Sequence, residues 1–342
     1  MRLLPDNTFA LYADLLQKVQ DSRLAALHGG SYVSKLVHGS RYWYYQTRTL
    51  AGQVQRYLGK ESAELLAQIE AARQSQAALG AIMAERKRLV AMLILGGATP
   101  EKGRAAKILE KMADAGVFSA GGVLIGSFGF ACYGNMLGVS FDDTLRRTED
   151  MDFGFERELQ IGIQRDLKSD LAQTDESLAT PRQINPWVMP NDMVTPDGFK
   201  IEFLTTKSGP HDKAPVPIER FNIHAQPLDF MDYLIEDAQD AVVLSGAGIP
   251  VAVPNPARFA LHKLAISQRR PVGSQAKVKK DLAQAGKLIE VLATENPGAL
   301  ILAHDAILRR PDHFGKVVAS GALRLSDAAK AALKSVLPEL LP

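Results

Sequence analysis

The spacing of apolar residues divides the first 95 residues into three stretches. Apolar side chains recur at helical spacing over residues 5–27, which predicts an opening helix. Aromatic and β-branched residues, interrupted by two glycine-containing turns, then predict a small antiparallel β-ribbon of two or three strands at about residues 32–59. The proline-free stretch from Lys60 to Leu95 is rich in alanine, glutamate and arginine, so it predicts one long helix or a helical pair.

The pattern from residue 96 onward predicts an α/β core followed by helices. An amphipathic helix is expected over residues 101–116, then a buried strand or helix end in VLIGS (residues 123–127) that runs into a glycine-serine turn and a further helix. RRTEDMDFGF and KIEFLTT read as strands separated by a polar, proline-rich loop. Helical patterns dominate from Asn255 to the end. We therefore expect three units: residues 1–95, a core at 96–254 and a helical domain at 255–342.

Three acidic residues lie where strand alternation places them together. In Asp150-Met151-Asp152-Phe153, both carboxylates point to one face of a strand and the apolar side chains point to the other. Glu202 has the same alternation between Ile201 and Phe203, and a neighbouring strand would bring it beside the two aspartates. Carboxylates gathered in this way repel one another unless a cation neutralises them, and oxygen ligands suit Mg²⁺ or Mn²⁺. The alternative is an ordinary solvated strand end.

The turn at Gly126 and Ser127 is a second candidate site. Backbone N–H groups at such a turn, together with the start of the next helix, can hold phosphate oxygens, and Ser127 adds a hydroxyl. The alternative is a tight strand-to-helix connection that needs glycine. Arg147 and Thr148, just before the acids, could bind triphosphate oxygens or position Asp150, or they could form part of a solvated turn.

Taken together, the glycine-serine turn, the Asp-x-Asp strand and the later carboxylate resemble the signature of the nucleotidyltransferase superfamily. IGSFGFACYGNMLG followed by RRTEDMDF is similar to a bacterial family with this fold. The resemblance implies a mixed-sheet nucleotidyltransferase core in which Asp150 and Asp152 bind Mg²⁺ or Mn²⁺, and Glu202 binds the metal or acts as a general base. Gly126 and Ser127 would hold the phosphates of a nucleoside triphosphate (NTP). It also implies that Lys263 and Lys280 reach those phosphates, whereas surface lysine is the plain alternative. The gap between Ser127 and Asp150 is longer than the superfamily's usual spacing.

The resemblance leaves the acceptor of the nucleotidyl group open among RNA, a protein hydroxyl and a small molecule such as an aminoglycoside, and by analogy it suggests a toxin-like or defence-related role. The β-ribbon interleaves aromatic and basic residues, among them Arg41, Trp43, Arg48, Arg56 and Tyr57. Such a pattern suits nucleic acid binding, or else a small core packed on the long helix. The rival function is a non-catalytic protein that senses nucleotide, or binds nucleic acid through this ribbon.

The composition is that of a globular protein, and the balanced net charge does not indicate a particular binding partner. The 342 residues are 46% hydrophobic and 23% charged, with 40 basic and 38 acidic residues, as in ordinary globular proteins. The single cysteine, Cys132, cannot form an intramolecular disulfide, and the histidines show no zinc-binding spacing, which favours a reducing cytoplasm. The apolar runs are too short or too rich in glycine for a membrane helix. We therefore expect a cytoplasmic protein without a membrane segment.

Overall fold

The structure is a computed structural model that describes residues 2–25, 31–37, 40–49, 52–146, 148–157, 165–181, 189–209 and 211–341. Its N-terminal part holds an edge strand, a helix, a three-stranded antiparallel ribbon in the order β2-β3-β4, and a helix of 33 residues. The predicted opening helix and ribbon are confirmed, and Lys60 to Leu95 contains one helix rather than a pair. The elements are β1 (Arg2–Leu3), α1 (Asp6–Ala25), β2 (Ser31–Val37), β3 (Ser40–Thr49), β4 (Gly52–Lys60) and α2 (Ala63–Leu95).

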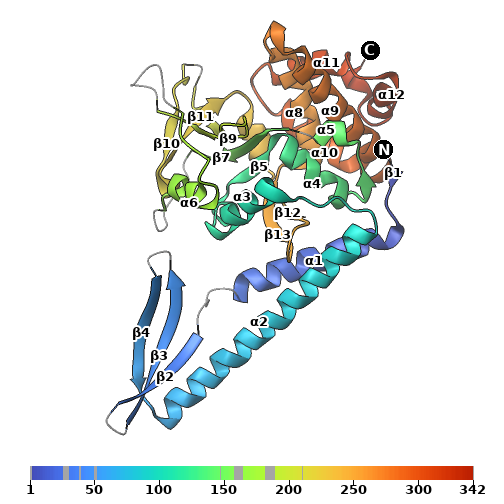
Figure 1. Cartoon of the computed structure of the whole chain (residues 1–342). Helices are drawn as coiled ribbons and strands as arrows, with labels where there is room; N and C mark the ends of the chain where they lie inside the picture. The colour runs from blue at the N-terminus through green and yellow to red at the C-terminus, as the bar shows by residue number, and fades with distance from the viewer. Residues whose placement is uncertain are drawn as a thin grey trace.

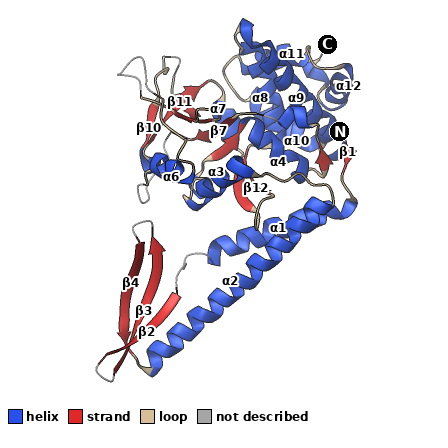
Figure 2. Cartoon of the chain, in the orientation of Figure 1, coloured by secondary structure: helices blue, strands red, loops and turns tan. Residues whose placement is uncertain are grey.

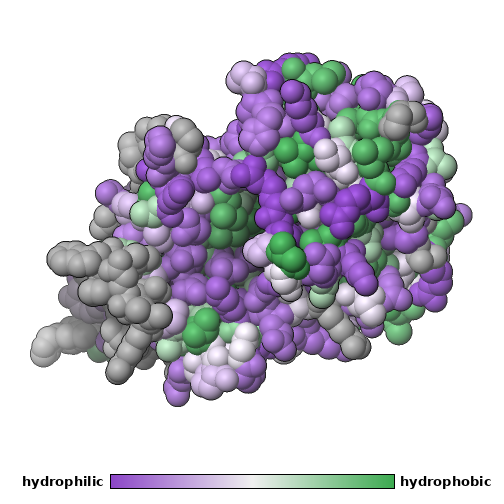
Figure 3. Space-filling model, turned by 90° about the horizontal axis from the view of Figure 1, so that it is seen from above, coloured by the Kyte–Doolittle hydropathy of each residue, from purple (hydrophilic) through white to green (hydrophobic). Residues whose placement is uncertain are grey.

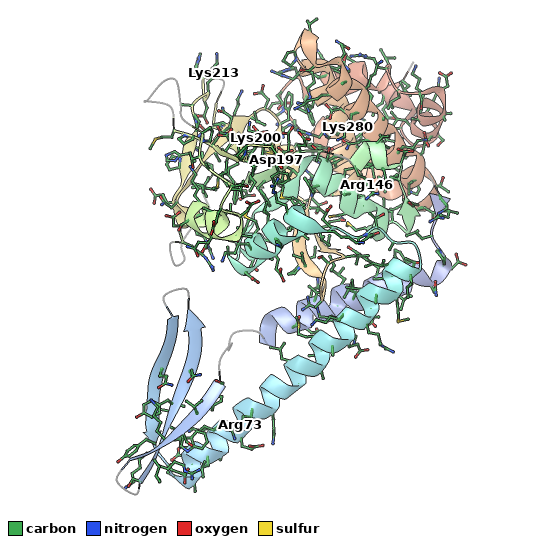
Figure 4. All side chains as sticks on the ribbon, in the orientation of Figure 1. Arg73, Arg146, Asp197, Lys200, Lys213 and Lys280 are labelled. Carbon is green, nitrogen blue, oxygen red and sulfur yellow. The ribbon has the colours of Figure 1, made fainter. Side chains whose placement is uncertain are left out.

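Helix α2 leads away from the core and carries the ribbon at its far end (Figure 1). The hydroxyl of Ser62 caps the start of α2 by accepting a hydrogen bond from the Leu65 amide at 3.1 Å. Trp43 of β3 fastens the ribbon to the helix, because its ring is 7% exposed and its indole N–H donates to Glu61 at 3.0 Å. The guanidinium of Arg73, at the ribbon end of α2 (Figure 4), covers the same ring. Trp43 therefore packs as the small-core interpretation predicts.

The centre of the protein is a six-stranded mixed sheet in the order β10-β11-β9-β7-β5, with β8 paired to β9 (Figure 2). Strands β7, β9 and β11 are parallel, whereas β5, β8 and β10 run antiparallel to their neighbours. The strands are β5 (Val123–Ile125), β7 (Asp150–Phe155), β8 (Asp192–Val194), β9 (Lys200–Thr206), β10 (Val216–Ile218) and β11 (Ile223–Leu228). Met151, Phe153, Ile201 and Phe203 are fully buried, so the predicted inward faces are confirmed.

Two further strand pairs and several helices cover this sheet. The hairpin β12 (Gln239–Val243) and β13 (Ile249–Val253) lies beside α1, and the Val242 amide donates to the Tyr12 hydroxyl at 2.9 Å. The short strands β1 and β6 (Val139–Ser140) pair with each other. The helices of this region are α3 (Gly103–Asp114), α4 (Gly126–Met136), α5 (Asp143–Arg146), α6 (Leu167–Thr174) and α7 (Met231–Ile235). The polar stretch before Pro181, expected to be a loop, contains α6, so that expectation is wrong.

The C-terminal region consists of packed helices, as expected, and these lie against one side of the sheet unit (Figure 1). They are α8 (Pro256–Arg269), α9 (Gln275–Glu295), α10 (Pro297–Leu308), α11 (Phe314–Ala322) and α12 (Asp327–Val336). Seen from above, the surface is mostly hydrophilic, with apolar residues in small separate patches (Figure 3). The boundaries expected at residues 95 and 254 stay a prediction.

His262 makes the packing of α8 sensitive to acid. Burial, followed by the neighbouring charge of Lys263, lowers the pKa of His262 from its usual 6.5 to about 3, and its Nε2 atom is buried without a hydrogen-bond partner. The unfolded chain takes up a proton at this residue near pH 6.5, whereas the folded protein does not. We therefore expect the free energy of unfolding to fall as the pH drops from 6.5 toward 3, by up to about 4 kcal/mol.

Urea titrations of the wild type and His262→Gln at several pH values between 7 and 4 measure this effect. The wild type should lose stability more steeply with falling pH than the variant, whatever their difference at pH 7. Parallel stability curves would show that His262 does not contribute to the acid response.

Candidate functional site

The three acidic residues predicted from the sequence meet on two neighbouring strands. Strands β7 and β9 pair in parallel so that Asp150 lies opposite Lys200, and Asp152 lies opposite Glu202. All three carboxyl-bearing residues are partly exposed, while the residues that alternate with them are buried. The two strands therefore present Asp150, Asp152 and Glu202 on one polar face, which is the arrangement that their alternation predicts.

The glycine-serine turn lies directly beside Asp152. Strand β5 pairs antiparallel with β7, which places Ile125 opposite Asp152. The next residue, Gly126, has a left-handed φ of 63° and begins α4. Ser127 follows it in the first turn of α4, where backbone N–H groups have no partner within the helix and the helix dipole favours anions. The turn and the aspartates thus form one continuous site.

Gly126 fits this site only because it has no side chain. A Cβ atom at this position would lie 2.1 Å from Oδ2 of Asp152, and the left-handed φ disfavours any other residue. We expect Gly126→Ala to displace the Asp152 carboxylate and to lower the rate of the reaction proposed below about 100-fold, since a shift of roughly 1 Å in a reacting group can have this effect.

Gly138→Ala is the matched control for Gly126→Ala. Gly138 has a similar φ of 65°, but a Cβ atom there meets no atom within 4 Å. It carries the same backbone strain without touching the acids. Equal rates for the two variants, measured with the label-transfer assay described below, would show that contact with Asp152 is unimportant.

Lysines from the C-terminal helices face the acids. Nζ of Lys277, in the first turn of α9, lies 3.2 Å from Oδ2 of Asp150. Lys280 is one turn further along α9, and burial, followed by the charge of Lys263, lowers its pKa. Figure 4 shows Lys280 on these helices and Lys200 on the sheet side. Both predicted lysines, Lys263 and Lys280, therefore lie in the electrostatic neighbourhood of the aspartates.

Lys263 is held by a buried ion pair. It is 8% exposed, and its Nζ atom donates to Oδ1 of Asp281 at 2.6 Å. The other oxygen of Asp281 accepts from Nε of Arg270 at 2.9 Å. Asp281 is 3% exposed, and its two cationic partners help to keep its pKa low despite burial. The carboxylate of Asp281 thus fixes Lys263 and Arg270 in place.

Electrostatics within the acidic group are unfavourable in the structure. Burial, followed by the charge of Glu202, raises the pKa of Asp152 to about 6. The charge of Asp150 contributes to this rise, and the charges of Lys263 and Lys277 oppose it. The carboxylate of Glu202 accepts a hydrogen bond from Lys200 at 2.7 Å, and Lys200 also contacts Asp192 at 3.1 Å. Two carboxylates side by side, one of them desolvated, form a place where an added cation would be stabilised.

The segment before Asp150 positions that aspartate. The Asp150 amide donates to the hydroxyl of Thr148 at 3.2 Å, which agrees with the predicted positioning role. Arg146 forms an ion pair with Asp143, as the solvated-turn interpretation predicts, although its Nε atom is buried and without a partner. Arg147 lies outside the described residues, so its predicted phosphate contact stays a prediction.

An open cavity of about 870 Å³ borders Asp150 on the side away from the C-terminal lysines. Thr148, Arg146 and Arg104 contribute polar atoms to its wall, and the rings of Phe128 and Phe199 meet edge to face there with centroids 6.5 Å apart. The cavity is large enough for a ligand the size of a nucleotide. Asp150 lies in its wall, whereas Asp152, Glu202 and the turn at Gly126 lie outside its lining.

Several residues of this site were not predicted from the sequence. Gln284 of α9 donates to the Leu145 carbonyl at 2.7 Å and lies 3.3 Å from the Ser127 hydroxyl, so it ties α9 to the turn. Lys200, Lys277 and Asp281 were also missed as members of the site. The Lys279-Lys280-Asp281 run was a sequence signal for Asp281 alone. No sequence signal marked Lys200 or Lys277, and lysine on an amphipathic helix usually marks a solvated face.

The described residues contain no group of three or more His, Cys, Asp or Glu side chains arranged to hold a metal ion. Mg²⁺ seldom needs one, because proteins usually bind it through one or two carboxylates while water and substrate phosphates complete its octahedral coordination. Asp150 and Asp152, on one face beside a phosphate-binding type of turn, fit this requirement. None of the described helices is both long and apolar enough to cross a membrane.

The fold and site therefore define an α/β protein in which paired strand carboxylates adjoin a glycine-serine helix start. Residues 104–308, more than half of the chain, match the protein-family model described as nucleotidyltransferase. The chain belongs to this nucleotidyltransferase family, and the resemblance stated from its motifs is confirmed. No curated protein matches the chain, and no solved structure matches it.

Proposed function

We propose that this protein is a metal-dependent nucleotidyltransferase that moves a nucleoside monophosphate from an NTP to an acceptor hydroxyl and releases pyrophosphate. The hydroxyl oxygen forms a bond to the α-phosphorus as the bond from that phosphorus to the β-bridging oxygen breaks. The observation that carries the proposal is the adjacency of Asp150 and Asp152 to the turn at Gly126, opposite the lysines of α8 and α9.

In this proposal the turn and the lysines bind the triphosphate. The amides at the start of α4 and the Ser127 hydroxyl receive phosphate oxygens. Lys263, held by Asp281, and Lys280 supply positive charge from the opposite wall, and Lys277 exchanges its contact with Asp150 for one with phosphate. These cations stabilise the charge that collects on the leaving pyrophosphate.

The acids would bind the divalent cation and accept the proton of the acceptor hydroxyl. Asp150 and Asp152 would hold Mg²⁺ or Mn²⁺, which when bound lowers the pKa of the acceptor hydroxyl and orients the triphosphate. Glu202 either joins them as a ligand or accepts the hydroxyl proton, and the hydrogen bond that it accepts from Lys200 holds its carboxylate in place. Thr148 orients the Asp150 backbone.

Transfer of label from each α-³²P-labelled NTP, in the presence of Mg²⁺ or Mn²⁺ and either total RNA or cell lysate, tests the proposal. Label should move to a macromolecule or small molecule with the wild type and not with Asp150→Asn/Asp152→Asn. Asp14→Asn/Asp21→Asn removes the same charge from the exposed side of α1 and should transfer normally. Tight NTP binding without transfer to any acceptor would contradict the proposal and favour nucleotide sensing.

A further inference from the structure

The β-ribbon has a composition unlike the rest of the chain. Residues 31–60 contain five of the 40 lysine and arginine residues and none of the 38 acidic residues. They also contain five of the eight tyrosines and one of the two tryptophans. The other three tyrosines, Tyr12, Tyr133 and Tyr233, are buried in the core. The ribbon is thus a cationic, ring-rich module, whereas the remainder of the chain has a slight excess of acid.

Only one of the two faces of the ribbon packs against α2. Trp43 points toward α2. Its indole N–H donates to Glu61, just before α2, and the guanidinium of Arg73 in α2 lies over its ring. Alternation along β3 places Tyr42 and Tyr44 on the opposite face, which we call the outer face, and neither ring is fully buried. The extra residue at the register shift between Trp43 and Tyr44 lies on β4, so this alternation is unbroken. Packing on the helix therefore does not account for the two tyrosines.

Polar and cationic groups cross the outer face beside these rings. Lys35 lies opposite Tyr42 in the ladder, and its Nζ atom is 4.9 Å from the centre of the Tyr44 ring. The same ammonium donates to Gln55 at 2.6 Å, and Gln55 donates to Gln46 at 2.7 Å. One polar side chain from each of the three strands, an ammonium and two amides, is therefore joined by hydrogen bonds next to two aromatic rings.

We propose that the outer face of the ribbon binds single-stranded RNA. Sequence-tolerant binding of single strands combines aromatic rings, on which bases stack, with cations that contact the phosphates, and antiparallel sheets commonly present both to RNA. The complete absence of acidic residues over these 30 residues favours a polyanionic partner. The amides of Gln46 and Gln55 can donate to and accept from a ribose 2′-hydroxyl, which DNA lacks.

This inference also suggests the acceptor in the proposed reaction, and in that respect it rests on the proposed function. RNA bound at the ribbon would be tethered to the molecule that carries the proposed nucleotidyltransferase site. Binding itself needs neither NTP nor divalent metal, so it can be tested separately from catalysis.

The experiment measures fluorescence anisotropy of a labelled mixed-sequence single-stranded RNA with the full chain, without NTP or divalent metal. Tyr42→Ala/Tyr44→Ala should weaken binding at least about 30-fold, whereas Tyr42→Phe/Tyr44→Phe, which keeps both rings, should stay within about threefold. Lys35→Gln should reduce the slope of log K against log salt by about 0.7, the contribution of one phosphate contact on a single strand. Asp150→Asn/Asp152→Asn should bind like the wild type, which separates this result from any failure of catalysis.

Three results would overturn the proposal: no RNA binding by the wild type, equal binding of DNA of the same sequence or of duplex RNA, and undiminished binding by the alanine pair. Circular dichroism shows whether the alanine pair keeps the ribbon folded. If it does not, the phenylalanine pair and Lys35→Gln decide the outcome, since both keep the Trp43 contacts. An unchanged salt slope in Lys35→Gln would then count against the proposal.

Discussion

Replacing Asp150 and Asp152 together with asparagine is expected to lower kcat/KM for nucleotidyl transfer by about three orders of magnitude. Asparagine keeps the size of each side chain but removes the negative charge that would hold a divalent cation, and a bound metal is worth several kcal/mol in transition states of this kind. The initial rate of label transfer at several Mg²⁺ concentrations measures the loss. A variant within tenfold of the wild type would remove these residues from the chemistry.

The single variant Asp152→Asn should also make the metal-free protein more stable. At pH 7 the Asp152 carboxylate is ionised although burial and Glu202 raise its pKa to about 6, so its charge opposes folding. We expect a melting temperature higher by about 2–4 °C at pH 7. The gain should shrink as the pH falls below 6, because the folded protein then protonates Asp152. A stability gain combined with lost transfer is not expected of a merely structural residue.

The second large effect is expected at Asp281. Asp281→Ala should lower the free energy of unfolding by about 3 kcal/mol, because it leaves Lys263 in a buried position without its carboxylate and also frees Arg270. Urea unfolding at pH 7 measures the change. Glu236→Ala, which removes the exposed partner of Arg258, should cost less than about 1 kcal/mol.

The double variant Lys263→Met/Asp281→Leu distinguishes stability from catalysis. It replaces a buried ion pair with apolar side chains of similar size and should recover much of the stability lost in Asp281→Ala. Nucleotidyl transfer should remain low, because the phosphate-facing ammonium is gone. Recovery of transfer together with stability would show that Lys263 serves only the packing of α8 against α9.

The sequence was most informative where a local period determines the geometry. Period-two alternation placed Asp150, Asp152 and Glu202 on exposed faces, and it placed Met151 and Phe203 in the core. The prediction that Glu202 lies beside the two aspartates required their strands to be neighbours, and the pairing of β7 with β9 meets this condition. The catalytic roles of the three acids stay predictions, because alternation places a carboxylate without showing what it binds.

Local sequence patterns could not predict contacts between elements that lie far apart in the chain. Lys277 contacts Asp150 because the fold brings the first turn of α9 to the first residue of β7. Nothing within residues 275–295 distinguishes Lys277 from the other helix lysines. Lys263 was predicted to meet phosphate, but its burial against Asp281 depends on how α8 packs on α9. Helix α6 was missed because its eight residues give too short an apolar pattern.

Helix α2 connects the ribbon to the core through a stretch with little lateral support. Between Ile69 and Arg86, none of the side chains that the structure describes is buried, and Gly80 lies near the middle with no atom within 4 Å of an added Cβ. Glycine weakens a helix interior by about 1 kcal/mol relative to alanine. We therefore expect α2 to bend more easily in this stretch than at its two packed ends. We expect a load applied at the ribbon to bend α2 near its midpoint before it disturbs the central sheet.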